Sequence, residues 1–159
     1  MTTYVLIPGM CHGAWCFDDL AAALRTEGHR VLALTLTGVA ERAHLLPGGV
    51  NLDTHISDVL AAIDADAAGD DHLVLVGHSY GGMVITGVAT HLGGRIDAIA
   101  YIDAFLPGDG QSLWDMTGEQ DHQFYIDGQR DMPGLVAPLP FLPPEPRLNE
   151  LLRAVDWRF

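Results

Sequence analysis

Short apolar runs alternate with longer amphipathic stretches along the first two thirds of the chain. Four runs rich in Val, Leu and Ile are bounded by Gly, Pro or polar residues, a pattern typical of buried strands. These runs are residues 3–9, 30–38, 72–77 and 96–107. Apolar residues at helical spacing predict helices over residues 14–29, 51–65 and 80–94. This alternation predicts a doubly wound, mostly parallel α/β sheet with helices on both faces.

The pattern changes after Pro107. Residues 108–147 are rich in Gly, Pro, Asp and Gln, so we expect irregular or cap-like structure there. The residues from 147 to 159 predict one short helix. We therefore expect an α/β core over residues 1–107, and the start of a cap with an irregular tail over residues 108–159.

Composition and charge narrow the choice of partners. The net charge is -13, with 21 acidic residues, which disfavours nucleic acid and anionic membranes as partners. No apolar run is long enough to cross a membrane and the N-terminus lacks a leader pattern, so we expect a cytoplasmic protein. The spacing of Cys11 and Cys16 fits neither a zinc site nor a disulfide framework. We expect two buried thiols, no metal and no cofactor.

The segment around Ser79 carries the most informative motif. Residues 77–81, GHSYG, have the form G-x-S-x-G between a predicted strand and a predicted helix, which is the context of a nucleophile elbow. The sharp turn crowds the backbone, so residues two before and two after the serine must lack bulk. The alternative is that Ser79 is only the N-cap residue of the helix.

An ester-cleaving serine also needs donors that stabilise an oxyanion. One predicted donor is the backbone N–H of Tyr80, directly after Ser79. The loop PGMCHGAW after the first strand is expected to supply the other, with the N–H of Met10 as the candidate. We interpret His12 in this loop as a packed, hydrogen-bonded residue and not as the base. Three residues of the loop are expected to border the substrate: Gly9, Cys11 and His12.

Five segments in consistent order resemble the α/β-hydrolase superfamily. They are PGMCHGAWCF, LTGVAERAHLL, NLDTHISDVLAAI, VLVGHSYGGMVITGVA and YIDAFLPGDGQSLWDM. Within the superfamily they resemble the small cap-bearing carboxylesterases, a group that includes methylesterases and hydroxynitrile lyases. The resemblance implies the strand order 2-1-3-4, with Ser79 as the nucleophile and Met10 and Tyr80 as oxyanion donors. The family's acid and histidine follow two later strands, so we expect these 159 residues to be a truncated form without them.

The resemblance implies hydrolysis of a small carboxylic ester through a Ser79 acyl-enzyme, impaired where the base is missing. Within this chain, the remaining candidates are His122 as the base and Asp103 as the acid. Asp103 ends the predicted strand beside that of Ser79, a position where some α/β-hydrolases carry their acid. Trp114 and Phe124 are the candidate apolar lining of the substrate pocket.

Two other functions stay open. An inactive or pseudoenzyme fragment would bind a small ligand or a partner chain; the missing histidine favours it and the intact elbow disfavours it. A hydroxynitrile lyase is disfavoured, because the lyases of this group use Thr where this chain has Met10, and a Lys that this chain lacks. Finally, the apolar strand at 96–103 would be a sheet edge, so we expect self-association through it or poor solubility.

Overall fold

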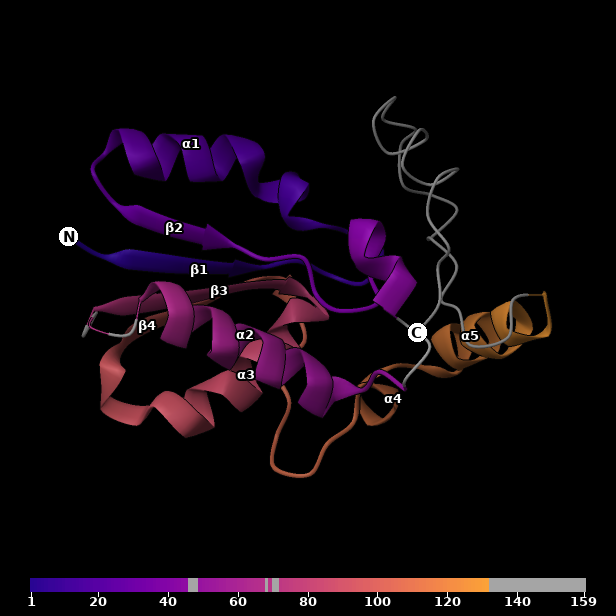
Figure 1. Cartoon of the computed structure of the whole chain (residues 1–159). Coiled ribbons are helices and arrows are strands. Elements are labelled where there is room, and N and C mark those ends of the chain that lie inside the picture. The colour runs from indigo at the N-terminus through magenta and orange to yellow at the C-terminus, as the bar shows by residue number, and fades with distance from the viewer. Residues whose placement is uncertain (46–48, 68, 70–71, 132–159) are drawn as a thin grey trace.

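A four-stranded parallel sheet forms the centre of the computed structural model (Figure 1). The structure describes residues 1–45, 49–67, 69 and 72–131. The strands are β1 Thr3–Ile7, β2 Arg30–Ala33, β3 Leu73–Ser79 and β4 Ile96–Ala104. Their order is β2-β1-β3-β4, and every neighbouring pair is parallel. The predicted fold class and the predicted strand order are both confirmed.

Helices cover both faces of this sheet (Figure 1). One face carries α1 Asp18–Thr26, which follows the 3-10 turn η1 Ala14–Phe17. The opposite face carries α2 Leu52–Asp66 and α3 Gly81–Leu92. Two further 3-10 segments are η2 Ala40–Leu45 and η3 Gly93–Arg95. The alternating faces of β1 and β3 therefore bury two separate cores.

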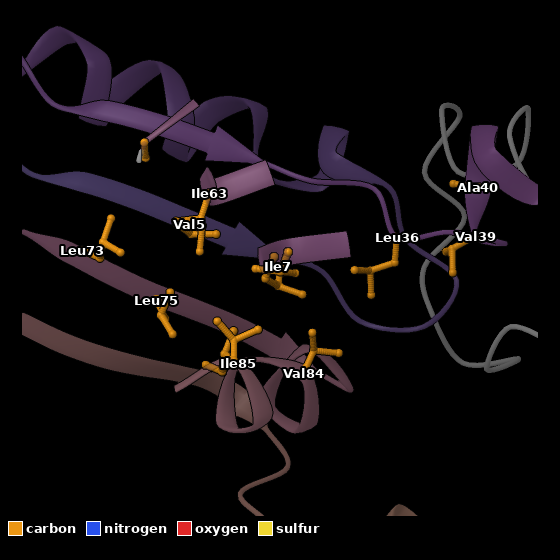
Figure 2. Close-up of a cluster of buried hydrophobic side chains, with 13 residues drawn as sticks. Val5, Ile7, Leu36, Val39, Ala40, Ile63, Leu73, Leu75, Val84 and Ile85 are labelled. Atoms are coloured by element: carbon orange, nitrogen blue, oxygen red, sulfur yellow. The ribbon is translucent and has the colours of Figure 1, made fainter. Parts of the chain in front are cut away.

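The larger core lies between the sheet and the pair α2 and α3. Val5 and Ile7 of β1 meet Leu75 of β3 and Ile85 of α3, and all four side chains are fully buried (Figure 2). Leu6 points to the other face and joins the smaller core under α1. Burying each such side chain stabilises the fold by about 1.5–3 kcal/mol. This packing fixes the register of β1 against β3, whose last residues carry the candidate site.

Helix α2 is the longest helix in the described part of the chain, with 15 residues. The side chain of Asn51 accepts a hydrogen bond from the Thr54 N–H, and the Thr54 hydroxyl accepts one from the Asn51 N–H, so the helix begins with a capping box. None of the helices in residues 1–45, 49–67 and 72–131 is long and apolar enough to cross a membrane.

Strand β4 is the exposed edge of the sheet. Its residues Asp97 to Ala100 are all exposed, and successive strand residues point to opposite faces, so both faces of this stretch are open. Ile96 and Tyr101 of the same strand pack against the larger core. Ile99 is 39% exposed and Ile102 is 44% exposed. The expectation that this strand lies at an edge is therefore confirmed.

Residues after Pro107 differ from the sequence-based expectation. The expectation was irregular or cap-like structure, and up to residue 131 the chain forms the helices α4 Leu113–Met116 and α5 Glu119–Asp131. The irregular alternative is therefore wrong for these helices, and the start of a cap stays a prediction. The physical reason at α4 is a capping box, in which the Ser112 side chain accepts from the Asp115 N–H and the Asp115 carboxylate accepts from the Ser112 N–H. The helix predicted over 147–159 lies outside the described residues.

The two cysteines have different environments. Cys11 is buried, whereas Cys16 on η1 is exposed, and neither is in a disulfide bond. The prediction of burial is thus confirmed for Cys11 and wrong for Cys16, because η1 turns that side chain away from the core. Burial raises the pKa of the Cys11 thiol to about 12, so the thiol stays protonated at neutral pH.

Candidate active site

Ser79 is the last residue of β3, and its backbone is in the left-handed region with φ of 51°. Tyr80 returns to helical angles, φ -55° and ψ -30°, and it is the N-cap residue of α3. Ser79 is therefore not the helix N-cap, and that alternative is wrong. A left-handed backbone at a residue with a side chain is strained, and such strain persists only where the surroundings impose it.

Backbone contacts on both sides of the turn impose this conformation. A Cβ atom added at Gly77 would lie 2.7 Å from the carbonyl carbon of Gly81. A Cβ atom at Gly81 would collide with the carbonyl oxygen of Ile7 and lie 2.8 Å from that of Pro8. The glycines that the motif requires are therefore needed because three backbone segments meet here without room for a side chain.

The loop after β1 passes directly over Ser79. A Cβ atom added at Gly9 would lie 2.8 Å from the Ser79 Cβ and 3.3 Å from its Oγ. Met10 follows at once, so its backbone belongs to the segment nearest the serine. Among the residues that the structure describes, neither the Met10 N–H nor the Tyr80 N–H has a hydrogen-bond acceptor. Both groups are thus unoccupied donors, as an oxyanion site needs.

Two histidines flank the turn without contacting the serine hydroxyl. The His12 Nδ1–H donates to the carbonyl oxygen of Met10 at 3.0 Å, in agreement with the interpretation of His12 as a hydrogen-bonded loop residue. The rings of His12 and His78 meet edge to face with centroids 5.8 Å apart. Burial lowers the pKa of His78, nearby His12 lowers it further, and Asp103 opposes both effects. Within the described residues, no imidazole is hydrogen-bonded to Ser79.

Asp103 lies in a β-bulge beside the turn. His78 pairs with Ile102 and Ser79 pairs with Ala104, so Asp103 is the extra residue of β4. Its φ is 43°, another left-handed backbone at a residue with a side chain, and the residue is exposed. Bulges next to active sites re-aim side chains. The structure thus brings Asp103 to the carboxyl edge of the sheet next to Ser79.

His122 contacts Trp114 in two ways. The two rings are stacked with centroids 3.6 Å apart and planes 7° apart. The His122 Nε2–H donates to the carbonyl oxygen of Trp114 at 2.7 Å. The structure therefore pairs His122 with Trp114, and it does not assemble Ser79, His122 and Asp103 into one hydrogen-bonded group.

Helix α5 lies near the loop that carries Met10. Burial raises the pKa of the Tyr125 phenol, and smaller contributions come from Asp121 and from Cys11 of the loop. The ring of Phe124 meets that of Tyr125 edge to face, with centroids 5.8 Å apart. Figure 1 shows α4 and α5 beyond the carboxyl ends of the strands. These two helices are thus on the side of the sheet where Ser79 ends β3.

A surface cavity of about 590 Å³ lies elsewhere, between α2 and the segment after β2. Its lining residues are Leu34, Thr35, Arg42, Thr54, Ser57, Asp58, Ala61 and Ala62. None of the predicted site residues lines it. Hydroxyl side chains line this cavity, but no histidine does, so its lining offers no imidazole base beside them.

One residue next to the elbow was not identified from the sequence. His55 of α2 is buried, and its Nδ1 lies 2.8 Å from the hydroxyl oxygen of Tyr80. The sequence does contain a sign that His55 is buried. It lies four residues before Val59 and eight before Ile63, a spacing that places all three on one face of α2.

Glycine substitutions on α3 test the close packing at the turn. Gly81→Ala should lower the free energy of unfolding by about 1–3 kcal/mol, the usual cost of overpacking, because its Cβ meets backbone oxygens. Gly87→Ala is the matched control on the same helix. Its Cβ meets no backbone atom and only the Cγ1 and Cδ1 atoms of the Ile56 side chain, which can shift, so we expect a smaller loss than in Gly81→Ala. Urea unfolding of both variants measures the difference, and equal losses would contradict this explanation.

Comparison with known proteins supports the resemblance. The model of the alpha/beta hydrolase family matches residues 4–159. A carbendazim hydrolyzing esterase from Nocardioides sp. (strain SG-4G) is 55% identical over 113 residues, which cover 71% of this chain and 46% of that protein. Esterase PIR7B from Oryza sativa subsp. japonica is 32% identical over 116 residues, covering 73% of this chain and 43% of that protein.

Solved structures give the same result. An extracellular alpha/beta-hydrolase from a Paenibacillus species superposes with a TM-score of 0.77 at 30% identity, covering 89% of this chain and 56% of that one. Polyneuridine aldehyde esterase superposes with a TM-score of 0.64 at 25% identity, covering 83% of this chain and 50% of that one. The chain spans about half the length of the proteins it matches. With the family model matched from residue 4 onward and the elbow in place, this chain belongs to the alpha/beta hydrolase family.

Proposed function

We propose that Ser79 is the nucleophile of a carboxylic ester hydrolase. The observation that carries the proposal is the left-handed backbone of Ser79, at φ 51°, held beneath the glycine loop that follows β1. A turn that stores strain at a serine is explained by chemistry at that serine. The esterases among the relatives support this reading of the site.

The proposed reaction runs through an acyl-enzyme. The Ser79 Oγ attacks the ester carbonyl carbon while its proton passes to a general base. The N–H groups of Tyr80 and Met10 donate to the oxyanion that develops. The intermediate then collapses, the alcohol leaves with the proton, and water hydrolyses the acyl group. No step requires a metal or another cofactor.

The described residues do not supply Ser79 with a hydrogen-bonded base. No described histidine is hydrogen-bonded to Ser79, and the His122 Nε2–H is engaged by Trp114. We therefore propose that the 159-residue chain is an impaired hydrolase. Asp103 is the proposed acid, because its bulge places it beside Ser79 and close enough to affect the pKa of His78.

The substrate is proposed to be a small-molecule ester under a cap. Helices α4 and α5 would begin that cap, consistent with a domain boundary near Pro107. Trp114 is 47% exposed and is therefore available as apolar lining, together with Phe124. The loop residues Gly9, Cys11 and His12 would border the same space. We choose carbendazim as a test substrate because one relative is a carbendazim hydrolyzing esterase.

Two alternative functions can be compared with the site. A pseudoenzyme that binds a ligand or partner chain is favoured by the absence, among the described residues, of an imidazole bonded to Ser79. A hydroxynitrile lyase is opposed by Met10 in the loop and by the lack of lysine. A cytoplasmic location stays a prediction, and the Paenibacillus relative is described as extracellular.

We also propose that two copies of this chain associate through β4. The strand is open on both faces over residues 97–100 and carries Ile99 and Ile102 at 39% and 44% exposure. Its outer edge presents backbone N–H and C=O groups that another strand can pair. Asp97 and Asp103 near its ends are its only charged residues, so the middle of the strand offers little repulsion.

Reaction with p-nitrophenyl acetate tests the nucleophile. The 159-residue chain should release at most one equivalent of p-nitrophenol slowly and then turn over near background, because serine without its base is weakly nucleophilic. Ser79→Ala should abolish the burst, and mass spectrometry should find the acetyl group on Ser79. Burst kinetics with carbendazim as a second substrate extend the test. Rapid turnover that His122→Ala removes would instead establish the compact site with His122 and Asp103.

Paired substitutions at Met10 test its proposed oxyanion role. Met10→Pro removes the N–H and should slow acylation of Ser79 by about 10²- to 10³-fold, the usual loss for one oxyanion donor. Met10→Ala keeps the N–H and should retain most of the rate. Stopped-flow acylation rates measure the pair, with circular dichroism as the control for folding. Equal rates in the two variants would remove Met10 from this role.

Light scattering tests the proposed association through β4. The unmodified chain should form dimers or larger species as its concentration rises. Ile99→Lys places a charge on the open strand and should shift the chain towards monomer. Leu106→Lys is the control, since Leu106 is 60% exposed but lies beyond the strand. A strictly monomeric unmodified chain at high concentration would contradict the proposal.

A further inference from the structure

A buried series of hydrogen bonds joins Thr37, His55 of α2 and Tyr80, the residue after Ser79. The His55 Nε2 lies 2.9 Å from the carbonyl oxygen of Thr37, and its Nδ1 lies 2.8 Å from the hydroxyl oxygen of Tyr80. The rings of His55 and Tyr80 meet edge to face with centroids 5.6 Å apart. His55 is only 1% exposed, so water does not substitute for these partners.

The partners determine which atoms donate. A carbonyl oxygen only accepts, so the His55 Nε2 carries the proton that Thr37 receives. Burial lowers the pKa of His55; the Thr37 carbonyl and Asp58 oppose this effect, and Arg42 adds slightly to it. The imidazole is therefore neutral at neutral pH, its Nδ1 has no proton, and the Tyr80 hydroxyl donates to it.

Thr37, at the other end of this series of hydrogen bonds, is also held by α2. The Thr37 N–H and hydroxyl donate to the two carboxylate oxygens of Asp58, at 2.7 Å and 2.9 Å. Asp58 is three residues after His55, so both side chains lie on one side of the same helix. Thr37 therefore cannot move away from His55 without breaking three hydrogen bonds, and the acceptor for Tyr80 is fixed in place.

We propose that His55 is a positioning residue that holds the Tyr80 backbone N–H in place for the oxyanion. The inference rests on the proposed ester hydrolysis at Ser79. Rotation of the peptide between Ser79 and Tyr80 would relieve the strain at Ser79 and turn that N–H away. The Tyr80 side chain is held by His55 and packs against the larger core, so this rotation is opposed. The effect is on the transition state, because the N–H bonds only the developing charge.

A second tyrosine, Tyr101, provides a matched control for removing the Tyr80 hydroxyl. The Tyr101 hydroxyl of β4 is hydrogen-bonded to the Thr86 hydroxyl of α3 at 2.8 Å. Tyr80→Phe and Tyr101→Phe thus each remove one tyrosine hydroxyl bond connected with α3, but only the first lies at the elbow. A general loss of helix packing would affect both variants alike.

The first measurement is the rate at which a p-nitrophenyl phosphonate ester labels Ser79 in the 159-residue chain. Tyr80→Phe should lower the maximal labelling rate by about threefold to tenfold, the effect of one neutral hydrogen bond, with the half-saturating concentration unchanged. Tyr101→Phe should stay within about twofold of the unmodified chain. His55→Asn should retain most of the rate, because the Asn oxygen can accept from Tyr80 where Nδ1 did. Equal losses in the two Phe variants, or none in Tyr80→Phe, would overturn the proposal.

The second measurement does not depend on reactivity at Ser79. Nitrogen NMR should show His55 neutral, with the proton on Nε2, and the amide resonances of Ser79 and Gly81 should shift in Tyr80→Phe but not in Tyr101→Phe. If the unmodified chain is not labelled at Ser79, the proposed function fails and these resonances decide the positioning alone. A proton on Nδ1, or unshifted Ser79 and Gly81 resonances, would refute it.

Discussion

Close backbone contact around Gly77 and Gly81 is the constraint on which the rest of the site depends. The carbonyl oxygens of Ile7 and Pro8 lie where a side chain at Gly81 would be, so α3 begins directly against the end of β1. This contact forces β3 to turn sharply at Ser79 and leaves the serine in a left-handed backbone. The loop after β1 continues from this contact and passes over the Ser79 hydroxyl.

Parallel topology explains why the other site residues arrive at the same place. The carboxyl ends of β1, β3 and β4 lie at one edge of the sheet, so the loop with Met10, the turn at Ser79 and the bulge at Asp103 are neighbours. Helix α2 supports this edge from one face through His55. The strain at Ser79 is thus balanced by the contact between Gly77 and Gly81 and by contacts from elements distant in sequence.

Much of this arrangement could be predicted from the sequence. The G-x-S-x-G spacing between apolar runs identified the turn, and alternating elements identified the parallel sheet, because both depend on local periodicity. Helix α5 was missed, since most of its residues are polar and it lacks the apolar face by which α2 and α3 were recognised. The bond from His55 to Tyr80 was also missed, because it joins residues 25 positions apart. The pairing of His122 with Trp114 depends on tertiary packing that periodicity does not encode.

The contacts that hold Ser79 have a consequence for how the chain is made. They run from the carbonyl of Ile7 to that of Phe105, whose N–H also donates to the Ser79 carbonyl. All the residues that make these contacts have therefore been synthesised once residue 105 has been added to the chain. The strained backbone of Ser79 is thus held by residues that are synthesised before α4 and α5, the helices that we propose begin the cap.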